Sequence, residues 1–152
     1  MEMNNEWVKD PKVFNINREK AHASIHRYAS PEEMHTNKSS YIYSLNGKWK
    51  FHYANGFNQL IKDFSNKDYN SDNWDEINVP GHIQLQGYGT PMYVNQIYPW
   101  SATEQIIPGE IPEHNPIGSY ITYFDSSVIK DNTDVYINFK GVESAMALWV
   151  NG

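Results

Sequence analysis

The feature that most constrains this chain is a long run of backbone breakers in its middle. Most of its 8 prolines and 9 glycines fall between residues 80 and 118. Neither a helix nor a central strand can continue through prolines spaced so closely. The same stretch carries large rings, Tyr88, Tyr93, Tyr98 and Trp100, which disordered segments seldom do. We therefore expect a long ordered loop, and ordered loops of this length are usually functional.

The segments on either side of this loop have the patterns of β-strands. After the turn Asn46-Gly47, aromatic residues at 49, 51 and 53 alternate with polar ones, which predicts a strand with one apolar face. After the loop we expect three more strands, over 119–124, 135–139 and 145–150. Asn151-Gly152 is a strong hairpin signal and predicts a returning strand. We therefore expect an all-β domain that is truncated at its C-terminal end.

The N-terminal part of the chain differs in character. Residues 1–29 are polar and follow no regular period, so we interpret them as an extended arm that precedes a β domain over residues 30–152. Ser30-Pro31-Glu32-Glu33 has the order of a capping box and predicts a short helix. Residues 57–64 fit one or two further helical turns.

Composition narrows the class of protein. A chain of 152 residues fits one domain of ordinary size, and its net charge of −6, with 12 scattered Lys and Arg, argues against nucleic-acid binding. The absence of cysteine excludes disulfides, thiolate zinc sites and a cysteine nucleophile. We see neither a signal peptide nor an apolar run that could span a bilayer, so we expect no membrane partner and a cytoplasmic location.

The sequence offers no convincing catalytic or metal-binding group. His22 and His26 have ligand-like spacing but lie in the arm, so a surface role is the simpler interpretation. Glycoside hydrolysis, for example, needs two carboxyl groups about 5 to 10 Å apart across the scissile bond. The nearest pairs are Glu32 with Glu33, Asp63 with Asp68, and Asp72 with Asp75. None of them suits that geometry, so we expect no catalytic residue and no metal ligand in this chain.

The segment 89–100 is the most informative part of the loop. Pro91 and Pro99 bracket an extended piece that carries Asn95, and rings lie on both sides of it. An asparagine amide both donates and accepts hydrogen bonds, as sugar hydroxyls do. The apolar C–H faces of a pyranose stack on flat rings. Asn95 is therefore a candidate sugar ligand, although asparagine in loops commonly bonds to local backbone instead.

A set of ordered motifs resembles the N-terminal sugar-binding domain of the β-galactosidases of glycoside hydrolase family two. The resemblance covers nearly the whole chain. Its motifs are Trp7 to Arg18, Ala21-His22, Ser44 to Phe51, Val79-Pro80, Gly87-Tyr88, Pro91 to Asn95, Tyr98-Pro99, Asn115 to Tyr120, Gly141 to Ala145 and Leu148 to Gly152. One departure is Pro80-Gly81-His82-Ile83, where many relatives carry Pro-Ser-x-Trp.

The resemblance implies a jelly-roll-like, galactose-binding-domain-like β-sandwich with an extended arm and one or two short helices. It implies that the parent enzyme hydrolyses terminal non-reducing β-D-galactose residues, as in lactose, with retention. Both catalytic glutamates would lie in a TIM-barrel domain outside this chain, with magnesium and a sodium or potassium ion nearby. It implies that Asn95, on a loop reaching that active site, contacts the substrate, and that the intact enzyme is a homo-oligomer.

Three alternatives remain open at this stage. A β-glucuronidase or β-mannosidase of the same family would share the sandwich, although the combination of Asn46-Gly47-x-Trp49 with Tyr93-x-Asn95 favours a galactosidase. A free-standing carbohydrate-binding module is the second alternative; the final Asn151-Gly152 turn without a returning strand argues against it, as does an arm with nothing to dock on. An assembly role of the arm is compatible with the galactosidase interpretation.

Overall fold

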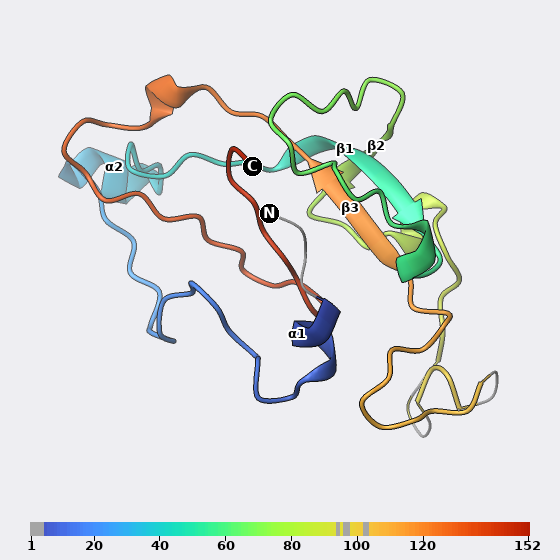
Figure 1. The fold of residues 1–152 in the computed structure, drawn as a ribbon. Helices are drawn as coiled ribbons and strands as arrows, with labels where there is room; N and C mark the ends of the chain where they lie inside the picture. Colours follow the sequence, from blue (N-terminus) through green and yellow to red (C-terminus); the bar gives the residue numbers. More distant parts are fainter. Residues whose placement is uncertain (1–4, 94, 96–97, 102–103) are drawn as a thin grey trace.

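A small antiparallel sheet forms the centre of the molecule (Figure 1). The structure is a computed structural model and describes residues 5–93, 95, 98–101 and 104–152. Strand β1 (Gly47–Ala54) lies between β2 (Asp75–Val79) and β3 (Ile117–Ile121), in the order β2-β1-β3. Both pairings are antiparallel. The expected strand with alternating aromatics is therefore confirmed, and it is the middle strand of the sheet.

The register places the aromatic residues of β1 on one face. Phe51 lies opposite Asp75 of β2 and Tyr120 of β3, and directly opposed residues of an antiparallel pair share a face. The Phe51 ring packs against Tyr120 at 4.8 Å and against Tyr88 at 4.7 Å between centroids. Only 1% of Phe51 is exposed. This ring is therefore the centre of the core on that face.

A second ring cluster covers the other face of the sheet. His52 of β1 lies 5.5 Å from Trp74, which in turn packs against Phe64 at 5.9 Å. Phe64 also contacts Trp149 at 5.7 Å in an edge-to-face arrangement. The segment before β2 and the C-terminal segment thus meet over this face.

The short helices lie outside the sheet. They are α1 (Asn5–Lys9), α2 (Pro31–Thr36) and the 3-10 turns Phe57–Gln59, Gln84–Gln86 and Ser126–Val128. The N-terminus of α2 has the expected cap, since the Ser30 hydroxyl accepts a hydrogen bond from the Glu33 amide at 3.2 Å. The helix ends at Asn37, whose φ of 53° is left-handed, a conformation that asparagine tolerates better than most residues.

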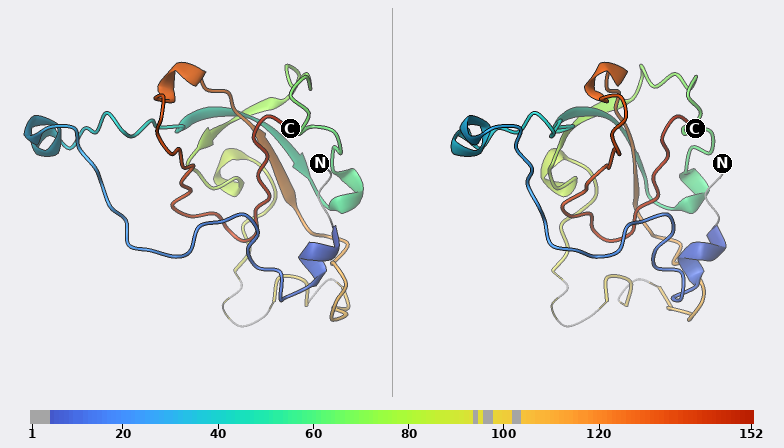
Figure 2. Two further views of the ribbon diagram at one scale, coloured as in Figure 1. Left: turned by 60° about the vertical axis from the view of Figure 1, so that its left-hand side comes forward. Right: turned by 90° about the vertical axis from the view of Figure 1, so that its left-hand side faces the viewer.

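The arm is extended over most of its described length. After α1 ends at Lys9, no helix or strand is assigned between residues 10 and 29, and nearly all of those residues are exposed. Figure 2 shows α2 far from the sheet, at the end of two long coil segments. The short helix at residues 5–9 was not expected from the sequence. The domain boundary at residue 29 stays a prediction.

The C-terminal strands differ from expectation. β3 covers 117–121 rather than 119–124, and neither 135–139 nor 145–150 is assigned as a strand. A strand needs a neighbouring strand in a ladder, and within the described ranges no ladder is assigned to either segment. Side chains there are largely exposed, 57% for Val135 and 69% for Tyr136. The overall class, antiparallel β with a few short helices, agrees with the prediction.

Candidate functional site

The candidate site lies on the loop that connects β2 to β3. It leaves the sheet after Val79 and returns at Ile117. Both Figure 1 and Figure 2 show it extending well away from the sheet. Two groups of contacts hold it: the first ties its start to β1 and β2, and the second joins its middle to residues 113 and 114 near its end.

The first anchor consists of Gln86 and Tyr88. The Gln86 side-chain amide accepts a hydrogen bond from the Asn78 backbone N–H at 2.7 Å and donates one to the Asn78 carbonyl at 3.1 Å. The Tyr88 hydroxyl donates to Asp75 Oδ2 at 2.8 Å, while its ring packs on Phe51. Burial raises the pKa of the Tyr88 hydroxyl, and the Asp75 carboxylate raises it further. The loop is therefore tied to β1 and β2 up to residue 88.

The second anchor consists of Trp100 and Glu104. The Glu104 carboxylate accepts hydrogen bonds from the Glu113 N–H at 2.9 Å and the His114 N–H at 3.2 Å. The Trp100 indole N–H donates to the His114 carbonyl at 2.7 Å. Both residues thus hold the last part of the loop, just before it enters β3.

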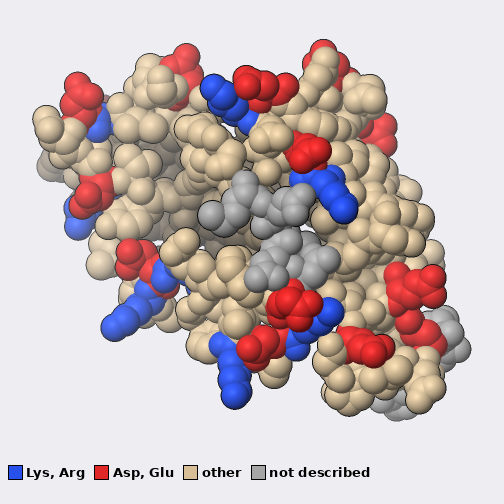
Figure 3. Space-filling view, in the orientation of Figure 1, with Lys and Arg blue, Asp and Glu red and all other residues tan. Residues whose placement is uncertain are grey.

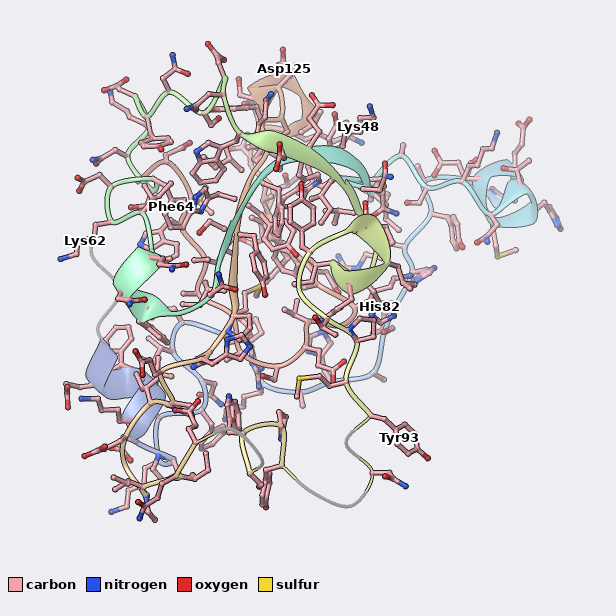
Figure 4. The ribbon with its side chains drawn as sticks, turned by 90° about the vertical axis from the view of Figure 1, so that its right-hand side faces the viewer. Lys48, Lys62, Phe64, His82, Tyr93 and Asp125 are labelled. Carbon is pink, nitrogen blue, oxygen red and sulfur yellow. The ribbon has the colours of Figure 1, made fainter. Side chains whose placement is uncertain are left out.

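Asn95 lies between the two anchors. Its side chain is exposed, and it has no hydrogen bond to any residue that the structure describes. Tyr93 is 86% exposed and Tyr98 75% exposed, and Figure 4 shows Tyr93 pointing away from the molecule. Exposed amide and ring groups at this place are available to a ligand that approaches from outside. The role assigned to Asn95 as a sugar ligand stays a prediction.

The other candidate groups have structural roles or none. His22 Nδ1 lies 2.8 Å from the Lys20 carbonyl within the arm. Glu33 accepts hydrogen bonds from the Ala29 and Ser40 backbone N–H groups, which lower the pKa of its carboxyl. Asp75 is bound to Tyr88. Nowhere in the described part of the chain do three His, Asp or Glu side chains gather closely enough to hold a metal ion.

Two hollows lie near the sheet. One of about 330 Å³ is lined by polar residues between Asp63 and Tyr69. The other, of about 500 Å³, lies beside β1 where β2 begins, and its lining combines aromatic rings with amide and carboxyl groups. The rings come from Phe51, Tyr53, Tyr69, Trp74 and Tyr88. Neither hollow includes Asn95.

The face shown in Figure 3 gives little support for nucleic-acid binding. On this face, Lys and Arg lie among Asp and Glu and form no basic patch. No helix within the described ranges is long and apolar enough to cross a bilayer.

Comparison with known proteins identifies the family. Residues 42–152 match the model of the family described as glycosyl hydrolases family 2, sugar binding domain. The chain belongs to this family. The match begins just before β1 and includes the whole sheet, both loop anchors and Asn95. The family suggested by the sequence motifs is therefore confirmed.

Several curated relatives are similar over nearly the whole chain. A protein named beta-galactosidase from Halalkalibacterium halodurans is 47% identical over 148 residues, which is 96% of this chain. One of the same name from Priestia megaterium is 43% identical over 151 residues. A beta-galactosidase large subunit from Leuconostoc lactis is 36% identical over 165 residues. The chain spans only 15% of the length of the first two relatives and 26% of the third.

Sequence reasoning predicted the loop and proposed Asn95 as a ligand, which stays a prediction, but it missed both anchors. Gln86 and Glu104 are ordinary polar residues in a segment without regular structure, and their partners are backbone groups 8 to 10 residues away. Because every residue has such backbone groups, these contacts leave no recognisable pattern in the sequence. The available hints were the large rings of Tyr88 and Trp100, since the hydroxyl of tyrosine and the indole N–H of tryptophan usually find a hydrogen-bond partner when they are buried.

Proposed function

We propose that this chain is the N-terminal sugar-binding domain of a β-galactosidase. The observation that supports the proposal is the similarity to proteins of that name, at 47% and 43% identity over 96% and 97% of the chain. The parent enzyme would remove terminal non-reducing β-D-galactose from β-D-galactosides such as lactose, with retention of configuration. This domain would supply a substrate-contacting loop and contacts between subunits.

In this proposal Asn95 is the substrate contact. Its amide can donate two hydrogen bonds and accept others, which suits adjacent hydroxyls of a galactose ring. The two loop anchors hold the chain on both sides of it, at Tyr88 and at Trp100. The side chain itself is exposed and therefore available to a sugar bound on another domain.

The chemical step would take place elsewhere in the parent enzyme. The acid and the nucleophile of a retaining glycosidase are two carboxyl groups about 5 Å apart, and we assign both to a TIM-barrel domain. In this chain Glu33, Asp75 and Glu104 already accept hydrogen bonds from local donors. Magnesium and a sodium or potassium ion would accompany the barrel. Since the described residues provide no cluster of ligands for them, we derive no step of the reaction through a metal.

The remaining partners follow from the same proposal. The intact enzyme would be a cytoplasmic homo-oligomer in which the arm, residues 1–29, contributes to subunit association. The exposed hydrophobic side chains of the arm, such as Phe14 at 77% and Ile25 at 79%, suit such contacts, because apolar groups gain free energy when they are removed from water.

A domain exchange tests the proposal. The matching segment of the Halalkalibacterium halodurans enzyme would be replaced by residues 1–152 of this chain, and the product is called the chimera below. We expect the chimera to hydrolyse lactose and a chromogenic β-galactoside at rates within an order of magnitude of the unmodified relative. A chimera that folds and assembles but hydrolyses neither substrate would contradict the proposal. Activity with β-glucuronides or β-mannosides in place of galactosides would favour a β-glucuronidase or a β-mannosidase as the parent enzyme.

A further inference from the structure

We propose that the hollow of about 500 Å³ beside β1 is a second sugar-binding site, which takes one neutral pyranose ring and performs no chemistry. It is called the β1 hollow below. Its lining residues lie between positions 51 and 88, and so precede Asn95 in the chain. Neither the sequence motifs nor the similarity to known proteins assigns a ligand-binding role to any of them. The proposal therefore does not depend on Asn95 as the substrate contact.

The β1 hollow exists because β1 continues past the beginning of β2. The pairing of β1 with β2 reaches only as far as Phe51, which lies opposite Asp75. On its other side, β1 is paired with β3 as far as Ala54. Beyond Phe51, no strand in the described part of the chain continues the sheet on the side of β2. The hollow thus lies at an edge of the sheet, where side chains from both faces can line it.

Aromatic rings from both faces form its apolar walls. On one face, the Tyr88 ring packs against Phe51 at 4.7 Å between centroids and lies 6.0 Å from the Tyr53 ring. On the other face, the Trp74 ring lies 5.6 Å from the Tyr69 ring. These rings hold one another in place, so little order has to be created when a ligand binds. Flat rings of this kind suit the apolar C–H faces of a pyranose.

Several polar groups of the β1 hollow have no partner within the described protein. Asp75 accepts a hydrogen bond from the Tyr88 hydroxyl through Oδ2, whereas its Oδ1 makes no hydrogen bond to a described residue. The exposed Asn73 amide likewise makes none. The Tyr69 hydroxyl accepts from the Trp74 indole N–H at 3.2 Å and keeps its own hydrogen to donate. The hollow therefore offers hydrogen-bond acceptors and donors together.

This combination fits a neutral sugar better than other small ligands. A sugar hydroxyl both donates and accepts, so it can use a carboxylate, an amide and a phenol at once. A cation would use only the acceptors. An anionic sugar such as a glucuronide would be repelled by the Asp75 carboxylate. The volume of about 500 Å³ lies within the range of small-molecule sites, which are typically lined by rings with a few polar groups.

The β1 hollow is separate from the segment that carries Asn95. None of the described residues of 89–100 lines it. Figure 4 shows Tyr93, two residues before Asn95, far from Phe64, whose ring packs on Trp74 in the wall of the hollow. A sugar in the hollow is thus a different one from the galactose that Asn95 is proposed to contact. We expect a Kd of about a millimolar, because a few bonds to a solvated sugar give little net free energy.

An NMR titration of the 152-residue chain tests the proposal. The probes are methyl β-D-galactopyranoside, methyl β-D-glucuronide and, as a polyol without a ring, glycerol. We expect the galactoside to shift the Trp74 indole resonance and the amides of residues 51–53 and 73–75 along one saturable curve. The glucuronide should bind at least about tenfold more weakly. The absence of saturable shifts at about ten times the expected Kd, or an equal response to glycerol, would overturn the proposal.

Variants connect the binding to named groups. Asn73→Ala should weaken binding of the galactoside about fivefold to tenfold, because one or two hydrogen bonds are lost. Asp75→Asn retains an oxygen that accepts from Tyr88 but loses the charge, so it should weaken galactoside binding and reduce the preference over the glucuronide. Asn138→Ala, an exposed asparagine outside the hollow, is the matched control and should bind like the unmodified chain. An unchanged Kd in both hollow variants would overturn the proposal.

Two comparisons keep this test separate from the proposed function. In the Asn95→Ala chain, the galactoside should shift residues 51–53 and 73–75 as it does in the unmodified chain, and loss of those shifts would overturn the proposal. The activity of the chimera is measured independently. Binding in the hollow together with an inactive chimera would retain the second sugar site and reject the β-galactosidase assignment. An active chimera whose parent chain shows no binding in the hollow would do the reverse.

Discussion

The side-chain amide of Gln86 pairs with the backbone of Asn78 as a neighbouring strand would. It accepts from the Asn78 N–H at 2.7 Å and donates to the Asn78 carbonyl at 3.1 Å. Asn78 belongs to β2, an edge strand of the sheet. Unpaired backbone groups on an edge strand invite association with other chains. Gln86 therefore both satisfies this edge and holds the first part of the loop.

Replacing Gln86 by alanine should destabilise the chain modestly. Both bonds to Asn78 would be lost, and water would replace them because the side chain is partly accessible. At about 0.5 to 1.5 kcal/mol for each bond, we expect the free energy of unfolding to fall by about 1 to 3 kcal/mol. Urea unfolding measures this directly. Gln84→Ala, at an exposed position two residues earlier, is the control and should leave the midpoint unchanged. Equal midpoints for both variants would contradict the pairing.

Gly118 should not tolerate a larger side chain. A Cβ at this position would lie 2.8 Å from the rings of both Phe51 and Tyr120. The Phe51 ring has no room to move, because it is almost completely buried. Overpacking of this kind costs about 1 to 3 kcal/mol, so Gly118→Ala should lower the melting temperature. Gly141→Ala is the matched control, since nothing lies within 4 Å of its Cβ position.

The turn around α2 should loosen in acid. Hydrogen bonds from the Ala29 and Ser40 N–H groups lower the pKa of Glu33 below its ordinary 4.5. A carboxyl whose pKa is depressed by folding stabilises the folded state above that ordinary value, and the contribution is lost as the pH falls through the lowered pKa. The amide resonances of Ala29 and Ser40 should therefore titrate together, with a midpoint below 4.5. Glu33→Gln should abolish this titration, and a midpoint at or above 4.5 would contradict the assignment.

Sequence reasoning succeeded where structure is local. The alternation at Trp49, Phe51 and Tyr53 predicted a strand with one aromatic face, and Ser30 with Glu33 predicted the capped start of α2. Both signals depend only on residues a few positions apart. The density of proline and glycine likewise predicted the loop correctly, because it excludes regular structure whatever the tertiary context.

It failed where structure depends on distant partners. The segments 135–139 and 145–150 have the composition of strands, but the described sheet ends at β3 and offers them no ladder. Their residue pattern suits a half-buried strand, but it does not provide another strand to pair with. The second anchor was missed for the related reason that the partners of the Glu104 carboxylate are backbone N–H groups, which every sequence has.

The isolated chain should neither hydrolyse galactosides nor bind galactose tightly. One loop with Asn95 supplies only one wall of a site, and a few bonds to a solvated sugar give little net free energy. Calorimetry with galactose or lactose should therefore show a Kd of about a millimolar or weaker. Hydrolysis of a chromogenic β-galactoside at a rate above that in buffer alone would contradict the prediction that the isolated chain is inactive. Micromolar binding in the ring-lined hollow of about 500 Å³ beside β1 would instead point to a free-standing sugar-binding module.

Asn95→Ala in the chimera should lower turnover and leave the fold unchanged. The side chain is exposed and makes no hydrogen bond to the described residues, so its removal neither opens a cavity nor leaves a protein partner unsatisfied. If its amide contacts galactose in a closed site, the lost bond costs about 1 to 3 kcal/mol, and more if it strengthens in the transition state. That free energy corresponds to a loss in kcat/KM of about tenfold to a hundredfold or more. The melting temperature should match that of the unmodified chimera, as should that of Asn138→Ala, an exposed asparagine elsewhere on the chain.

Two measurements on the Asn95→Ala variant separate the competing roles of this residue. An asparagine that only bonds to nearby backbone would, when replaced, lower the melting temperature and change the kinetics little. A substrate ligand gives the opposite pattern, because its partner is absent from the free protein. Asn95→Asp sharpens the comparison, since it keeps the size and the acceptors but loses both donors. If galactose hydroxyls accept hydrogen bonds from the amide, Asn95→Asp should lower kcat/KM nearly as much as Asn95→Ala. Full activity in Asn95→Ala would remove this residue from the substrate site.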